Sequence, residues 1–180
     1  MAGAMLISLE QYHERYSNEH GYEYWFGEVV RKSAPAWLHS ILQALLAELF
    51  TKAGYIAGSE LDLRINRDWE PRPDFAATIE PITEPYPTKP IQLVAEILSP
   101  DDTIPKIKDK CSLYSRIGIA QIYVLDPERK HAFEWNHEES DLEQVSDRLS
   151  LQNGVRIMLQ DIWSELDHRL KLRRSGESDK

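Results

Sequence analysis

The sequence predicts an α/β protein with a central mixed β-sheet flanked by helices. Two observations carry this prediction. Residues 35–52 have the apolar spacing of an amphipathic helix, and the segment 91–125 contains a strand, a helix and a second strand. A strand–helix–strand unit places its two strands parallel in one sheet. The chain has 180 residues, a length that suits one domain with its own core.

The first part of the chain predicts a helix, a hairpin and a longer helix. Ser8 can cap a helix over residues 8–18, and the alternating aromatic run 22–30 is typical of a hairpin. Residues 35–52 form the clearest helix, and Gly54 ends it. The apolar stripe of this helix consists of Trp37, Leu38, Ile41, Leu42, Leu45, Leu46, Leu49 and Phe50.

Short strands dominate the remainder. Residues 80–90 hold four prolines and predict a loop, because proline cannot join a strand ladder. A helix over 104–117 stops at Gly118, and a helical turn is expected at 161–166. We expect strands at 55–57, 60–65, 74–79, 91–98, 120–125, 130–135, 142–145 and 155–159.

The net charge of −9 argues against a general affinity for nucleic acid, which depends on neutralising phosphates with Lys and Arg. A metal-binding hydrolase can nevertheless be acidic overall and carry a local basic rim. The basic cluster at 169–174 is one candidate rim, but a solvated tail is the simpler interpretation. We therefore expect one domain over 1–168 and a frayed basic tail over 169–180.

Composition also bounds the setting of the protein. The sequence contains no run of about 18 apolar residues, so it predicts no transmembrane helix. The first residues lack the pattern of a signal peptide. The one cysteine, Cys111, excludes an internal disulfide and a cysteine-rich zinc site. These features favour a cytoplasmic protein.

Two carboxylates stand in segments that should be buried. Glu96 lies near the end of the apolar strand 91–98, on the same face as Val94 and Leu98. A carboxylate there is costly unless a cation or a metal compensates it, and an ion pair with a core Lys or Arg is the alternative. Asp74 opens another strand, where an ordinary turn aspartate bonded to a nearby backbone N–H is the alternative.

A lysine faces the same region from the helix over 104–117. Lys110 falls within the apolar arc of this helix, so it points inward, and Glu96 is its natural partner. A lysine whose head reaches water is the alternative, and Lys106, just outside the arc, is the reserve candidate. The arc is marked by Ile104, Ile107, Cys111, Tyr114 and Ile117.

Together these residues predict a metal-dependent phosphodiester hydrolase. Asp74, Glu96 and a backbone carbonyl would suit Mg²⁺ or Mn²⁺, which lowers the pKa of a bound water and screens phosphate charge. Lys110 would orient that water or stabilise charge in the transition state. The sequence has no Gly-rich phosphate loop, no nucleophile elbow and no histidine pair at metal spacing.

These motifs resemble a known family, the putative restriction endonuclease domain of uncharacterised bacterial proteins, within the PD-(D/E)xK nuclease-like superfamily. The hairpin at 22–28 and the segment 154–163 resemble its opening and closing elements, so the resemblance covers most of the chain. The motifs that carry it are Pro73-Asp74, Glu96-Ile-Leu-Ser-Pro100, Lys110-x-x-x-Tyr114 and Gly118-Ile-x-x-Ile-Tyr-Val-Leu-Asp126.

The resemblance implies a restriction-endonuclease-like core in which Asp74 and Glu96 are metal ligands and the carbonyl of Ile97 is a third. The superfamily signature places its lysine two residues after the glutamate, where this chain has Leu98. The resemblance therefore implies that the lysine has moved to the helix, as Lys110.

Further residues could join this site as accessories. His39 stands where the family often has a histidine, although a histidine at the boundary of the helix stripe is the simpler interpretation. Glu28 and Lys106 are the other accessory candidates, and Glu28 more simply ends the hairpin in solvent.

Two hypotheses from different classes follow. The first is a Mg²⁺- or Mn²⁺-dependent endonuclease acting on DNA, and a homodimer is expected because cutting a duplex needs two sites. The second is a catalytically inactive binding or interaction module, which the net charge of −9 favours. Convergence of Asp74, Glu96 and Lys110 around an open pocket would favour the nuclease, whereas a Lys110 in bulk solvent would weaken it.

Overall fold

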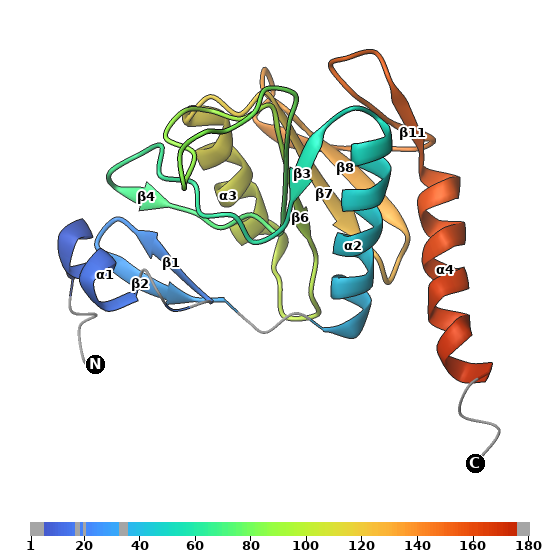
Figure 1. Ribbon diagram of the computed structural model, residues 1–180, viewed down its shortest axis with the longest axis horizontal. Helices are drawn as coiled ribbons and strands as arrows, with labels where there is room; N and C mark the ends of the chain where they lie inside the picture. Colours follow the sequence, from blue (N-terminus) through green and yellow to red (C-terminus); the bar gives the residue numbers. More distant parts are fainter. Residues whose placement is uncertain (1–5, 17–18, 20, 33–35, 176–180) are drawn as a thin grey trace.

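A six-stranded mixed sheet lies at the centre of the computed structural model, which describes residues 6–16, 19, 21–32 and 36–175 (Figure 1). The strand order is β3-β5-β6-β7-β8-β9, and only β6 and β7 are parallel. The strands are β3 (Ile56–Gly58), β5 (Phe75–Thr78), β6 (Leu93–Ile97), β7 (Gln121–Asp126), β8 (His131–Asn136) and β9 (Asp141–Val145). The predicted mixed sheet and its parallel pair are confirmed.

Helices cover both faces of this sheet. Helix α2 (Trp37–Lys52) and helix α4 (Leu159–Ser175) pack together on one face, and helix α3 (Ile104–Arg116) covers the other. Alternation along β6 divides the core: Leu93, Ala95 and Ile97 pack toward α2 and α4, whereas Val94 packs toward α3. Glu96 shares the parity of Val94, so the sheet presents its carboxylate to α3.

A smaller sheet lies at one end of the molecule, beside the short helix α1 (Leu9–Tyr16). Its order is β2-β1-β4, and all its pairs are antiparallel. The strands are β1 (Tyr22–Trp25), β2 (Glu28–Arg31) and β4 (Trp69–Glu70). The predicted hairpin over 22–30 is confirmed as β1 and β2, and it brings residues from the start of the chain to the edge of the central sheet.

One predicted strand is wrong. Residues 60–65 alternate like a strand but form a loop, and the strand of this region is β4. Leu63 explains the pattern, because it is fully buried against Trp69 while its backbone N–H bonds only to the carbonyl of Pro71. A buried apolar residue in a loop can thus produce the alternating pattern of a strand without forming the hydrogen bonds of one.

The C-terminal part also differs from the prediction. Strand β10 (Arg148–Ser150), which pairs with β11 (Arg156–Met158), was not predicted, because Leu149 is the one apolar residue within it. Helix α4 is longer than the expected turn at 161–166 and includes the basic residues 169–174. Arg169 bonds to Glu165 one turn earlier and to Glu48 of α2, and these contacts fix this part of the helix.

No helix within the described part of the chain is both long enough and apolar enough to cross a membrane. Residues 17–18 and Pro35, at the ends of the predicted first and second helices, lie outside the described residues.

Candidate metal-binding pocket

A pocket of about 110 Å³ opens between the small sheet and the central sheet. Residues far apart in the sequence line it, because the hairpin, α2, α3 and two strands of the central sheet meet there. Seven of its ionisable side chains make ion pairs with one another, and we call them the inner wall: Glu23, Lys32, His39, Glu60, Asp74, Glu96 and Lys110. Arg31, Asp101, Asp102 and Lys106 also line the pocket.

Asp74 stands at the head of β5, and both of its carboxylate oxygens have contacts. The backbone N–H of Ile97 donates to Oδ2 at 2.8 Å, and Lys32 Nζ donates to Oδ1 at 2.9 Å. Burial raises the pKa of Asp74, but the nearby His39 and the ammonium groups of Lys32 and Lys110 outweigh it and hold the pKa well below its usual range. Asp74 is therefore ionised at any physiological pH.

Glu96 projects from β6 toward α3 and is 4% exposed. The hydroxyl of Tyr114 donates to Oε1 at 2.6 Å, and Lys110 Nζ lies 3.0 Å from Oε1. Burial raises the pKa of the Glu96 carboxyl to about 7, because the ammonium of Lys110 offsets only part of the lost solvation and Asp74 adds repulsion.

Lys110 points into the protein, as its helical position predicts, and its side chain is 9% exposed. Its ammonium donates to Glu23 Oε1 at 3.0 Å as well as to Glu96. Burial alone would lower the pKa of Lys110, but these carboxylates raise it above its ordinary value. The alternative of a lysine whose head reaches water is wrong.

Three residues of the inner wall were not predicted. Glu23 lies in a strand among aromatic residues, so a buried carboxylate was detectable there by the signal that marked Glu96. Its Oε1 accepts a hydrogen bond from the backbone N–H of Arg72, and its Oε2 accepts one from Trp25 Nε1. Lys32 and Glu60 lie outside regular elements, where no periodicity indicates which way a side chain faces.

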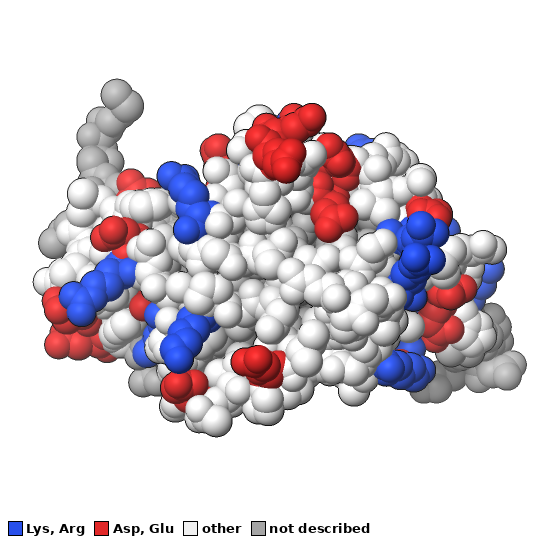
Figure 2. Space-filling view, turned by 90° about the horizontal axis from the view of Figure 1, so that it is seen from above, with Lys and Arg blue, Asp and Glu red and all other residues white. Residues whose placement is uncertain are grey.

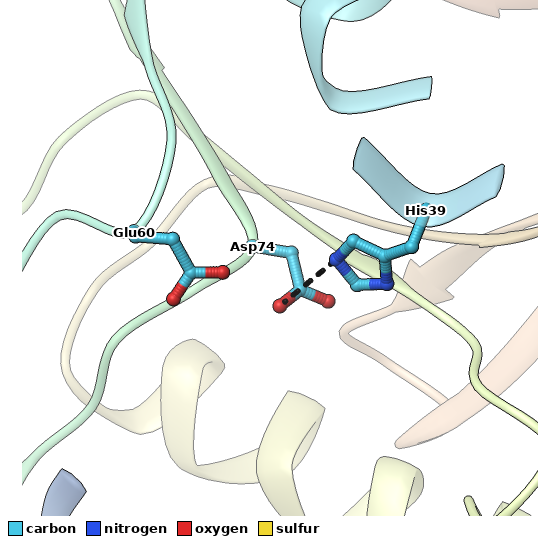
Figure 3. Close-up of side chains that lie close together, drawn as sticks. All are labelled: His39, Glu60 and Asp74. Atoms are coloured by element: carbon cyan, nitrogen blue, oxygen red, sulfur yellow. Dashed lines mark ion pairs between the residues drawn. The ribbon is translucent and has the colours of Figure 1, made fainter. Parts of the chain in front are cut away.

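Two of the three accessory candidates, His39 and Lys106, line the pocket, and Glu28 does not. His39 is buried, and its Nε2 lies 3.6 Å from Asp74 Oδ1 (Figure 3). Lys106 is exposed at the mouth of the pocket, whereas Glu28 is exposed and is not part of the pocket lining. Ile97 lines the pocket, and the proposed ligand role of its carbonyl stays a prediction.

The charges of the inner wall fit a divalent cation. Its carboxylates are those of Glu23, Glu60, Asp74 and Glu96, and its ammonium groups are those of Lys32 and Lys110. When all are ionised, negative charge exceeds positive charge by two. Uncompensated charge is costly at the buried members of this group, although Glu60 is 36% exposed, and one divalent cation would balance the excess. Carboxylate oxygens are the donors that Mg²⁺ and Mn²⁺ prefer.

Comparisons with known proteins agree with this fold. The sequence model of the family described as "Uma2: Putative restriction endonuclease" matches residues 9–170. The crystal structure of a putative nuclease belonging to DUF820 from Anabaena variabilis superposes with a TM-score of 0.73 at 18% identity, covering 89% of this chain and 99% of that chain. At this identity the likeness shows the fold alone.

A second solved structure, a DrdV–DNA complex, aligns with 69% of this chain and 10% of its own chain, at 17% identity and a TM-score of 0.39. A search of curated protein sequences finds no match.

The raised pKa of Glu96 predicts how stability depends on pH. The folded carboxyl has a pKa of about 7, above its ordinary value of 4.5, so its contribution to stability falls as pH rises from about 4.5 through 7. Glu96→Gln removes this penalty, because Lys110 keeps Glu23 as a partner. We expect the variant to gain on the order of 1–3 kcal/mol over the natural protein at pH 8 and much less at pH 5.

Urea unfolding of metal-free protein at both pH values measures this gain. Glu139→Gln, which removes an exposed carboxylate in the turn between β8 and β9, is the control and should show no such trend. A gain that is the same at both pH values would contradict the assignment of a raised pKa to Glu96.

Proposed function

We propose that this chain, which belongs to the Uma2 family of putative restriction endonucleases, is a metal-dependent endonuclease that hydrolyses DNA phosphodiester bonds. Membership of the family supports a nuclease function in general. The observation that carries the finer proposal is the buried pocket in which Asp74, Glu96 and Lys110 converge while negative charge is in excess.

In this proposal Asp74, Glu96 and the carbonyl of Ile97 hold Mg²⁺ or Mn²⁺. The bound ion supplies a water of lowered pKa and neutralises charge on the phosphate. Asp74 suits a ligand role, since its low pKa keeps it ionised. Glu96 suits the same role above a pH of about 7, where its carboxyl loses its proton. The hydroxyl of Tyr114 fixes the orientation of Glu96.

Lys110 would orient the attacking water or stabilise the charge that develops on the phosphate. Its contact with Glu23 holds the ammonium in place. When Glu96 binds a cation, Lys110 therefore still has Glu23 as an anionic partner. The charge of Lys110 is secure, because both carboxylates raise its pKa. A fixed donor in a site of low solvation stabilises a transition state more strongly than a mobile one in water.

DNA would meet a protein surface of mixed charge. Figure 2 shows one face of the molecule, on which basic and acidic side chains form separate groups with uncharged surface between them. With a net charge of −9, affinity for DNA would depend on a few basic side chains and on the metal rather than on a continuous basic surface. We further propose that the protein acts as a homodimer in the cytoplasm, since cutting a duplex needs two sites.

The net charge of −9 favours the second candidate, a binding module without activity. The buried position of Lys110 favours the nuclease, because a lysine directed into bulk solvent could not act together with Asp74 and Glu96 in the pocket. The following experiments separate the two candidates.

Removal of either carboxylate should abolish cleavage. We expect Asp74→Ala and Glu96→Ala to nick supercoiled plasmid DNA in Mg²⁺ or Mn²⁺ no faster than the natural protein nicks it in EDTA, because each variant loses a metal ligand. Circular dichroism should show both variants folded: Glu96→Ala relieves the burial and repulsion that raise the pKa of Glu96, whereas Asp74→Ala gives up the contacts with Lys32 and the Ile97 N–H. Glu139→Ala is the control and should cut normally. Normal cutting by both pocket variants would show that the site is wrongly assigned.

Substitution of the lysines should identify the one that assists cleavage. Lys110→Met should lower the cleavage rate by about 10²–10³-fold, the usual loss when a donor that stabilises the transition state is removed. The variant Glu23→Gln/Lys110→Met removes one charge of each sign, so it tests activity without an added imbalance of buried charge. Lys108, on the same helix, pairs with Asp141 at the surface, and Lys108→Met should keep full activity.

If instead Lys106→Met loses activity and Lys110→Met retains it, Lys106 at the mouth of the pocket takes the catalytic role and Lys110 is a structural cation.

A further inference from the structure

His39 is a buried histidine without a hydrogen bond. The residue is 6% exposed, and neither ring nitrogen has a hydrogen-bond partner among the residues that the structure describes. The nearest acceptor is Asp74 Oδ1, 3.6 Å from Nε2, which is too far for a hydrogen bond (Figure 3). A buried polar group that lacks a hydrogen-bond partner is costly, so an imidazole directed at a carboxylate indicates that a ligand binds between the two groups.

Glu60 completes a group of three possible ligands. One ligand atom each from His39, Glu60 and Asp74 lie within 4.8 Å of one another. Atoms bound to one ion at about 2.1 Å lie roughly 3.0 Å apart at a right angle and roughly 4.2 Å apart across the ion. The three side chains therefore need only small movements to close around one ion. Glu60 extends from the loop after β3, and its side chain is 36% exposed, so it has room to turn toward an ion that displaces its present partner Lys32.

The ammonium of Lys32 already stands where this ion would bind. Lys32 Nζ lies 2.9 Å from Glu60 Oε2 and 2.9 Å from Asp74 Oδ1, so it bridges two of the three possible ligands. Gln43 Nε2 donates to the other oxygen of Glu60 at 3.1 Å and to the carbonyl of Asp74 at 2.9 Å. The carboxylates are thus held in place around a position that a cation occupies.

We propose that His39, Glu60 and Asp74 form a second cation position, which takes a divalent transition-metal ion such as Mn²⁺ or Co²⁺ in place of the Lys32 ammonium. The position lies on the Oδ1 side of Asp74, whereas Oδ2 faces Ile97. An imidazole nitrogen suits Mn²⁺ and Co²⁺ better than Mg²⁺, which prefers oxygen ligands. The inference rests on the proposed function for the use of Asp74 as a ligand, and it adds a nitrogen ligand and a preference among metals.

The test is a titration of the metal-free, untagged full chain with Co²⁺, followed by visible absorption and by calorimetry. His39→Ala should weaken Co²⁺ binding at least about tenfold, the loss seen even for residues that only orient a ligand, and should change the absorption bands of the bound ion. Glu60→Gln should weaken binding in the same direction. Binding of Mg²⁺ should not change in His39→Ala. His168→Ala, which removes an exposed histidine of α4, is the control.

Lys32→Met gives an independent result. Without the competing ammonium, the variant should bind Co²⁺ more tightly than the natural protein and gain more in melting temperature when Co²⁺ is added. A purely structural role for the three ligands predicts no such gain, so a variant that binds no more tightly would contradict displacement of Lys32.

Equal Co²⁺ affinity and equal spectra for the natural protein and His39→Ala would overturn the inference, even if the protein cuts DNA with Mg²⁺. Loss of Co²⁺ binding in His39→Ala would support the inference, even if the natural protein cuts no DNA with any metal. The inference and the proposed function can therefore fail separately.

Discussion

The ammonium of Lys110, held between the carboxylates of Glu23 and Glu96, is the interaction on which the arrangement of the pocket depends. It joins three parts of the chain that are distant in sequence: the N-terminal hairpin, the central sheet and helix α3. Burying these charges is favourable only while each finds its partners, and removing one partner of a buried pair commonly costs about 3–5 kcal/mol. The hairpin is thus positioned against the sheet by the same contacts that form the inner wall of the pocket.

The pocket contains more negative than positive charge, and this excess connects the fold to the proposed chemistry. Lys110 and Lys32 each hold a pair of carboxylates, yet the wall remains acidic. Tertiary packing normally avoids such an imbalance, so its presence at an opening in the surface is better explained by a bound cation than by stability. The different surroundings of Asp74 and Glu96 move their pKa values in opposite directions, which is a common property of functional sites.

The sequence predicts this protein best where local periodicity and burial agree. The parallel pair of strands around α3 was predicted because a strand, a helix and a strand follow one another with clear apolar patterns. Glu96 and Lys110 were found because each interrupts such a pattern. The loop at 60–65 was misread, because Leu63 is buried without belonging to a ladder.

Contacts between distant, irregular segments were not predictable in the same way. Lys32 and Glu60 reach the pocket from outside regular elements, and their contact across the chain has no local signal. His39 was recognised as a candidate, but nothing in its helix pattern distinguishes a boundary histidine from one that faces Asp74. Only the packing of α2 against the central sheet determines its direction.

The central claim is that the pocket of Asp74 and Glu96 binds a divalent cation that cleavage requires. Calorimetric titration of the metal-free protein and of Glu96→Ala with Mg²⁺ and Mn²⁺, with DNA nicking measured on the same samples, tests it most directly. We expect the natural protein to bind the metal and to nick DNA only in its presence, and Glu96→Ala to lose both properties. A natural protein that neither binds these metals nor nicks DNA would contradict the account and would make the pocket a buried network of ion pairs in a binding module.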